Sequence, residues 1–152
     1  MNDTIKFEIS IPTDKDGYVL LQCPNCGTFF KMTPEDFQSD GILAIHCPSC
    51  GLEGDNYFTK DVLDLALAKA KNWAQKHIKD ELKKIEKKTD GIVSFSVESK
   101  LETEYESPIV STIDAMEIVF FPCCRKSIKI NPLLKMTGAY CPFCGVINYD
   151  FD

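Results

Sequence analysis

The chain has 152 residues, of which 44% are hydrophobic and 26% charged, with a formal net charge of −6. Its length suits one domain or two very small ones, and its ordinary composition excludes collagen-like structure and wholesale disorder. No apolar run approaches the roughly 18 residues that span a bilayer, and the first residues lack the features of a secretory signal. We therefore expect no membrane partner and a cytoplasmic location. The acidic balance argues against general nucleic-acid affinity but leaves room for a local basic patch.

The first predicted element is a half-buried strand over residues 5–11, where hydrophobic and polar residues alternate. Asp14 to Gly17 then predicts a hairpin turn. Its D-x-D-G string weakly resembles a calcium loop, but the remaining ligands of such a loop are missing. Tyr18 to Leu21 predicts the strand that leads to the first cysteine.

Eight cysteines carry the clearest chemical signal, and six of them form three C-P-x-C-G strings. Such a turn directs two thiolates at one point, and its glycine supplies the backbone freedom that the turn requires. Two turns that meet face to face make the four-sulfur cage that zinc prefers. Disulfides explain the spacing less well in a chain that we expect in a reducing compartment. The three strings begin at Cys23, Cys47 and Cys141.

The first predicted zinc site consists of Cys23, Cys26, Cys47 and Cys50. These residues form two C-x2-C pairs with twenty residues between them, which is a zinc-site spacing. Residues 22–51 resemble the zinc-ribbon family. The resemblance implies two knuckles on adjacent β-hairpins that clamp one structural zinc ion.

A long helix is predicted from Thr59, a good N-cap residue, to about Lys88. Hydrophobic residues recur there at steps of three and four, which gives the helix a broad apolar face. Its length would be roughly 43 Å at about 1.5 Å per residue. We expect this helix to lie across both cysteine modules as their shared core. The alternative is that part of it projects and serves a partner helix.

The same helix carries a stripe of lysines. Residues 69–88 contain eight lysines and three acidic residues, a local charge of +5 (8 − 3). Five of these lysines share one sector opposite the apolar face, where a stripe of positive charge can follow phosphates. The candidate nucleic-acid-binding residues are Lys69, Lys76, Lys79, Lys83 and Lys87.

Residues 92–97 and 115–121 predict two antiparallel strands. The segment between them is acidic, and like charges there discourage aggregation between strands. Its glutamates are Glu98, Glu102, Glu104 and Glu106.

Residues 121–145 are predicted to be a second, shorter copy of residues 23–51. In both copies the chain continues from a cysteine through hydrophobe-Lys-hydrophobe to Thr-Pro or Asn-Pro, and the proline stands eight positions after that cysteine. Thr33 and Asn131 are the residues predicted to cap a short helical turn opened by each proline.

The second predicted site consists of Cys123, Cys124, Cys141 and Cys144. The repeat aligns Cys124 with Cys26 and puts Phe121 where Cys23 stands, so the second copy is atypical. Adjacent cysteines can both bind one ion only if the turn is distorted. Two alternatives stay open: a degenerate module with Cys123 as a free thiol, and a crossed arrangement in which each metal takes one pair from each half of the chain. The expectation is two zinc ions per chain.

No catalytic motif is present, and a four-cysteine zinc ion leaves no position open for water. His46 and His77, the two histidines, are not expected to act in catalysis. We therefore expect a non-catalytic zinc-binding protein that acts as a protein–protein interaction module, adaptor or accessory subunit. The first alternative is a nucleic-acid-binding or transcription-related zinc ribbon. A second alternative is an iron electron carrier, because C-P-x-C-G knuckles also resemble rubredoxins.

The expected fold class is α+β, with two zinc-ribbon β-hairpin modules flanking a long amphipathic helix and a small antiparallel sheet. The predicted divisions are 1–58 for the N-terminal strand and first ribbon, 59–90 for the helix, and 91–152 for the strands and second module.

Overall fold

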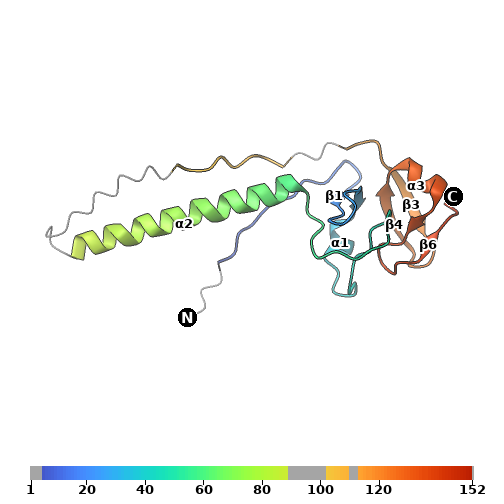
Figure 1. Cartoon of the computed structure of the whole chain (residues 1–152), viewed down its shortest axis with the longest axis horizontal. Helices are drawn as coiled ribbons and strands as arrows, with labels where there is room; N and C mark the ends of the chain where they lie inside the picture. Colours follow the sequence, from blue (N-terminus) through green and yellow to red (C-terminus); the bar gives the residue numbers. More distant parts are fainter. Residues whose placement is uncertain (1–4, 89–101, 110–112, 152) are drawn as a thin grey trace. The chain divides into compact units, whose positions relative to one another are not determined.

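The computed structural model describes residues 5–88, 102–109 and 113–151 (Figure 1). They belong to two compact units, one within Met1–Ser10 and Asp61–Pro108 and the other within Ile11–Lys60 and Ile109–Asp152. The strand predicted at residues 92–97 lies outside the described residues. The division into 1–58, 59–90 and 91–152 follows the order of motifs along the chain and stays a prediction.

A four-stranded antiparallel sheet forms the centre of the second unit. In spatial order its strands are β1 (Val19–Gln22), β2 (Phe29–Met32), β4 (Lys126–Ile130) and β3 (Glu117–Phe121). The two hairpins β1–β2 and β3–β4 are joined at the middle of the sheet, where Lys31 of β2 stands opposite Lys129 of β4. Each lysine comes five residues after the equivalent cysteine of its repeat. The two copies therefore meet about a local two-fold axis.

The repeat predicted from the sequence is confirmed by the elements that follow each hairpin. Helix α1 (Pro34–Phe37) is capped by Thr33, and helix α3 (Pro132–Thr137) is capped by Asn131. The Thr33 side chain accepts a hydrogen bond from a backbone N–H at 3.3 Å, and the Asn131 side chain accepts one at 3.0 Å. The second copy ends in the short hairpin β5 (Ala139–Tyr140) and β6 (Ile147–Asn148).

The hydrophobic core is made by the two copies together. Leu21 and Phe30 of the first copy and Phe121, Ile128 and Ile130 of the second are fully buried in one cluster. Among the described residues, none of this cluster belongs to helix α2 (Lys60–Lys88). The expectation that the helix forms a shared core between two flanking modules is therefore wrong. The copies need no helix between them because each covers the hydrophobic side chains of the other.

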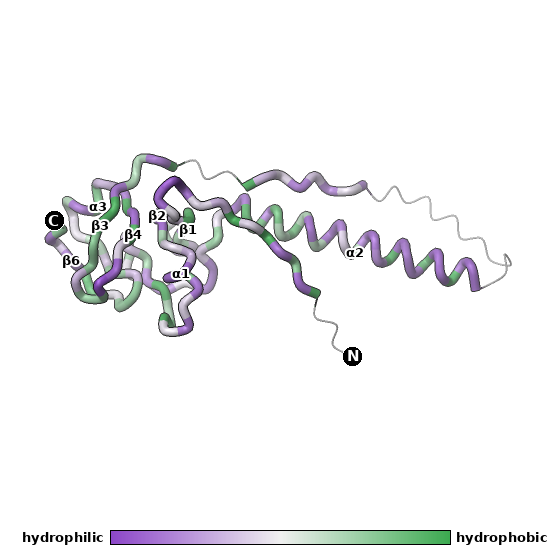
Figure 2. The backbone as a smooth tube through the Cα atoms, turned by 180° about the vertical axis from the view of Figure 1, so that it is seen from behind, coloured by the Kyte–Doolittle hydropathy of each residue, from purple (hydrophilic) through white to green (hydrophobic). Residues whose placement is uncertain are grey.

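Helix α2 has the bounds that the sequence pattern predicted, and hydrophilic and hydrophobic residues alternate along it (Figure 2). Only Val62 and Ala68 are buried on it. The Trp73 ring packs edge-on against Phe7 at 6.4 Å and stacks on the exposed His77 at 5.0 Å. Two further side chains tie the helix to the acidic segment, since Lys71 and Asn72 both bind Glu104.

The strand predicted at residues 5–11 is wrong, because these residues have no regular secondary structure. Two of their hydrophobic side chains contact different parts of the protein. Phe7 packs against Trp73, whereas Ile11 packs against the hydrophobic core of the second unit. At these two positions the hydrophobic side chains contact different units, so they do not share one face of a strand.

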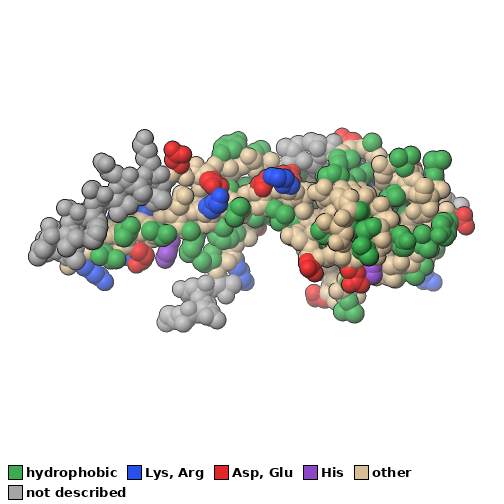
Figure 3. All heavy atoms as spheres, viewed as in Figure 1, with side chains coloured by type: hydrophobic (Ala, Val, Ile, Leu, Met, Phe, Trp, Pro, Cys, Tyr) green, Lys and Arg blue, Asp and Glu red, His purple; other side chains and the backbone are tan. Residues whose placement is uncertain are grey.

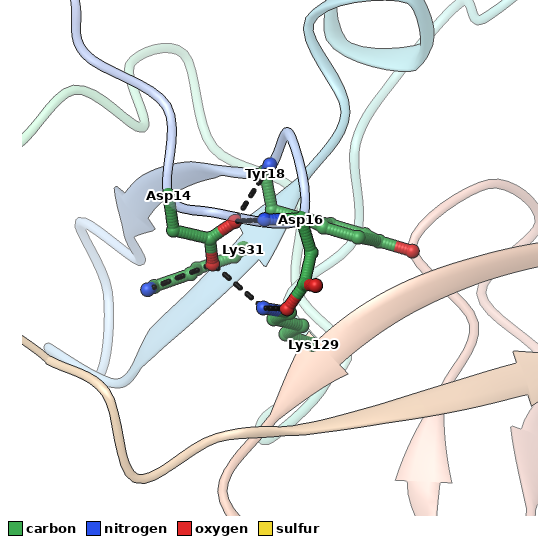
Figure 4. A network of polar contacts seen from close by, with 5 residues as sticks. All are labelled: Asp14, Asp16, Tyr18, Lys31 and Lys129. Atoms are coloured by element: carbon green, nitrogen blue, oxygen red, sulfur yellow. Dashed lines mark hydrogen bonds and ion pairs between the residues drawn. The ribbon is translucent and has the colours of Figure 1, made fainter.

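The predicted turn at Asp14–Gly17 is confirmed, and it neutralises the two lysines at the centre of the sheet (Figure 4). Lys31 and Lys129 are only 1% and 6% exposed. Asp14 Oδ2 accepts hydrogen bonds from both ammonium groups, at 3.1 Å and 2.7 Å, and Asp16 binds Lys129 at 2.5 Å. Asp14 Oδ1 accepts from the backbone N–H groups of Asp16 and Tyr18.

The Asp14 carboxylate stays ionised in this setting. Burial by itself would raise the pKa of Asp14, but the hydrogen bonds from Lys129, the Tyr18 backbone and Lys31 hold it well below its usual range. One ionised carboxylate therefore joins the two copies through a lysine from each.

We expect Asp14→Asn to lower the free energy of unfolding by about 3 kcal/mol, because it leaves two buried ammonium groups without their shared carboxylate. Asp16→Asn is the matched control and should lower the free energy of unfolding by less. The Asp16 side chain is 39% exposed, and of the two lysines it binds only Lys129. Urea unfolding of the zinc-loaded chain measures both. The contribution of Asp14 should be complete above about pH 4 and decline as the pH falls further, because its folded pKa is the lower one. Equal losses in the two variants would contradict the shared role of Asp14.

Candidate metal centres

The first cluster brings together the four cysteines that the spacing predicted. All four Sγ atoms lie within 4.8 Å of one another, with 3.8 Å from Cys23 to Cys50 and 3.6 Å from Cys26 to Cys47. Four sulfur atoms arranged as a tetrahedron about 2.3 Å from a zinc ion lie about 3.8 Å apart. The observed separations therefore fit a tetrahedral zinc ion.

Backbone groups of the two knuckles hold the sulfur atoms in place. The N–H groups of Asn25 and Ser49 approach the Sγ atoms of Cys23 and Cys47 at 3.4 Å and 3.3 Å. Each knuckle is closed by a glycine in the left-handed region, with φ of 76° at Gly27 and 72° at Gly51. N–H donors to sulfur reduce the repulsion among thiolates and fix the direction of each ligand.

The second cluster also converges. The four Sγ atoms of Cys123, Cys124, Cys141 and Cys144 lie within 4.8 Å of one another, and Cys144 is 3.6 Å from Cys123. This local grouping contradicts the crossed arrangement. It also favours a metal site over a module held by packing alone, because the adjacent cysteines both turn toward the same point.

Phe121 explains how the second cluster lost a ligand and gained another. It is fully buried where Cys23 stands in the first copy, and its ring packs edge-on against Phe151 at 5.3 Å. The replacement ligand, Cys123, lies two residues further along the turn. The Cys123 sulfur accepts a hydrogen bond from the side-chain amide of Asn148 at 3.7 Å. In the first cluster, by contrast, Cys23 and Cys47 accept hydrogen bonds from backbone N–H groups of their own knuckles. No motif in the sequence indicated that Asn148 contacts this site.

Arg125 occupies the position of the knuckle glycine. It has φ of 53° and is the one non-glycine residue with positive φ among the described residues. The same slot in the other three knuckles holds Gly27, Gly51 and Gly145. This agreement supports the alignment of Cys124 with Cys26 independently of the cysteines.

Hydrogen bonds join the second knuckle of each copy to that of the other. His46 N donates to Pro142 O at 2.9 Å, and the equivalent Tyr140 N donates to Pro48 O at 2.9 Å. The two bonds obey the same local two-fold axis as the central strands. His46 itself lies outside both sulfur clusters, with Nε2 3.6 Å from Glu53 Oε1.

The thiols influence one another in a way that favours a bound cation. Burial raises the pKa of Cys47 and of Cys141. Burial also raises the pKa of Cys26, but hydrogen bonds outweigh it and lower the pKa to about 6. These bonds come from the side chain and backbone of Thr28 and from the neighbouring thiols. Without a cation, the negative charge of the first thiolate therefore makes it harder for the neighbouring thiols to lose their protons. A divalent metal removes this conflict by neutralising the charge.

The candidate lysines of α2 fall into two groups. Lys69 forms an ion pair with Glu106 at 3.4 Å. The remaining candidates are exposed on the helix: Lys76, Lys79, Lys83 and Lys87. The nucleic-acid interface stays a prediction.

Comparison with known protein families, curated proteins and solved structures found no significant match. The geometry of the chain itself is therefore what indicates its function. That geometry provides two four-cysteine clusters, each able to hold a metal ion.

Elemental analysis of the untagged chain should find two zinc ions per molecule. Cys124→Ser should reduce the content toward one, because three sulfur ligands no longer close the second site. Ser49→Ala is the control within a knuckle, since it removes a hydroxyl and keeps the backbone N–H that approaches Cys47. One zinc in the unaltered chain would show that the second cluster is degenerate, and iron would favour electron transfer.

Arg125→Gly should stabilise the zinc-loaded chain by about 1 kcal/mol, because glycine occupies positive φ without steric cost. The matched variant is Gly27→Ala, where the added Cβ has only Gln22 Nε2 nearby, at 3.9 Å. It should be destabilising for conformational reasons alone. Denaturant unfolding of both variants tests the pair, and a destabilising Arg125→Gly would mean that the arginine side chain makes a contact stronger than the strain.

Proposed function

We propose that this chain is a non-catalytic zinc protein whose two four-cysteine centres hold a rigid scaffold for binding another protein. The resemblance of residues 22–51 to zinc ribbons supports zinc as the metal. Each centre offers four sulfur ligands, which fill the coordination sphere of zinc and leave no position for substrate or water. Structural zinc contributes roughly 10–16 kcal/mol in finger peptides, so the metal is expected to be required for folding.

The observation that carries the interaction role is the exposed apolar side of α2. Large hydrophobic side chains recur there along the helix (Figure 3). Leu67 and Ile78 are 55% and 54% exposed, and Leu63 and Leu82 are 42% and 39% exposed. An amphipathic helix whose apolar side is open to water is a typical contact surface for a partner protein. The proposed role is that of an adaptor or accessory subunit.

The second candidate function is nucleic-acid binding through the lysines of α2. The exposure of Lys76, Lys79, Lys83 and Lys87 favours it, since these side chains are open to phosphate groups. The ion pair of Lys69 and the overall charge of −6 weaken it.

No helix among the described residues combines the length and the apolar character needed to cross a lipid bilayer. We propose a cytoplasmic location, because zinc thiolate centres persist in a reducing compartment.

Two matched sets of substitutions distinguish the candidates. Leu67→Glu with Ile78→Glu should abolish co-elution with the partner that accompanies the native chain through nuclease treatment and size-exclusion chromatography. Lys76→Glu with Lys83→Glu should leave that partner bound. Titration with RNA and DNA at two salt concentrations completes the test, since a nucleic-acid binder would lose affinity and salt dependence in the lysine variant. Circular dichroism should show the same helix content in all variants.

A further inference from the structure

The second metal centre differs from the first in the exposure of the cysteines whose sulfur atoms face one another. Cys123 and Cys144 are both exposed, and their Sγ atoms are 3.6 Å apart. In the first centre, the sulfur pairs at similar distance each include a buried member: Cys47 beside Cys26, and Cys23 beside Cys50. Among the described sulfur pairs within 3.8 Å of each other, Cys123 and Cys144 are therefore the pair in which both cysteines are exposed, whereas Cys26 and Cys50 of the first centre combine an exposed with a half-buried cysteine.

We propose that Cys123 and Cys144 form an oxidation site, at which hydrogen peroxide converts the thiolate pair to a disulfide and releases the metal. The proposal rests on the proposed function to the extent that the second centre is loaded with zinc. Thiolate character and solvent access are the properties that select which cysteines are oxidised. This pair has both properties. Zinc holds its ligands as thiolates, and both cysteines are exposed to solvent.

One molecule of hydrogen peroxide accepts the two electrons that the two thiolates lose when they form a disulfide. A sulfur of the pair attacks one peroxide oxygen, so that an S–O bond forms, the O–O bond breaks and hydroxide leaves to become water. The facing sulfur then attacks this sulfenic sulfur, an S–S bond forms and the S–O bond breaks with loss of a second water. Two thiolates, one peroxide and two protons thus give one disulfide and two waters. The disulfide would leave two of the four sulfur ligands, which is too few to retain zinc, so the metal would be released.

The short separation favours the second step over further oxidation. The Sγ atoms at 3.6 Å need to approach by about 1.6 Å to reach the disulfide length of about 2.05 Å. Cys123 belongs to the adjacent-cysteine turn and receives one side-chain amide from Asn148. Cys47 of the first centre is instead fully buried and is approached by the backbone N–H groups of Ser49 and Cys50. The first centre is therefore expected to keep its metal under the same treatment.

The test treats the zinc-loaded full chain with hydrogen peroxide and follows metal release with a chromogenic chelator. Alkylation and peptide mass spectrometry then locate the disulfide. We expect one zinc to leave before the other, together with a Cys123–Cys144 disulfide that a thiol reductant and added zinc reverse. Simultaneous loss of both ions, a disulfide within the first cluster, or sulfonic acids without a disulfide would overturn the proposal.

Two variants control for weakened metal binding. Cys124→Ser removes a ligand but keeps the exposed pair, so the disulfide should still form. Cys123→Ser removes a ligand together with one member of the pair, so rapid disulfide formation should be lost. Equal behaviour of the two variants would contradict the assignment. Zinc analysis before oxidation separates this proposal from the proposed function. An empty second cluster would overturn the two-zinc scaffold. Mass spectrometry would still show whether the Cys123–Cys144 disulfide forms.

Discussion

The contact between β2 and β4 determines the rest of the second unit. It places Lys31 and Lys129, two buried cations, in equivalent positions of neighbouring strands, and Asp14 neutralises both. Because like charges are brought together at the centre of the sheet, the joined hairpins depend on that carboxylate. Once they are joined, the hydrophobic faces of both copies form one core, and the knuckles that carry the sulfur ligands pack against it.

The features that were predictable from the sequence are those encoded locally. The spacing of the C-P-x-C-G strings identified the first cluster because each knuckle is a turn of a few residues. The comparison of the residues after Cys26 and Cys124 identified the repeat, including the caps at Thr33 and Asn131. The bounds of α2 followed from its hydrophobic period. In each case the signal lies within a short stretch of chain.

The features that were missed depend on partners far away in the sequence. Asp14 lies 17 residues from Lys31 and 115 residues from Lys129, so nothing in the D-x-D-G string indicates which cations it binds. Periodicity shows that a segment has an apolar side but does not show what covers it. For this reason α2 was expected in a shared core to which it does not contribute, and residues 5–11 were expected in a strand that they do not form.

The local two-fold axis has an evolutionary consequence. Equivalent backbone bonds, from His46 to Pro142 and from Tyr140 to Pro48, join the copies as an isologous interface joins two subunits of a homodimer. Gene duplication and fusion of such a module would place both halves in one polypeptide. In a homodimer every substitution appears twice, whereas in the fused chain each half accumulates its own. Phe121, Cys123 and Arg125 are differences of this kind, because they stand in one half and the other half has the regular knuckle.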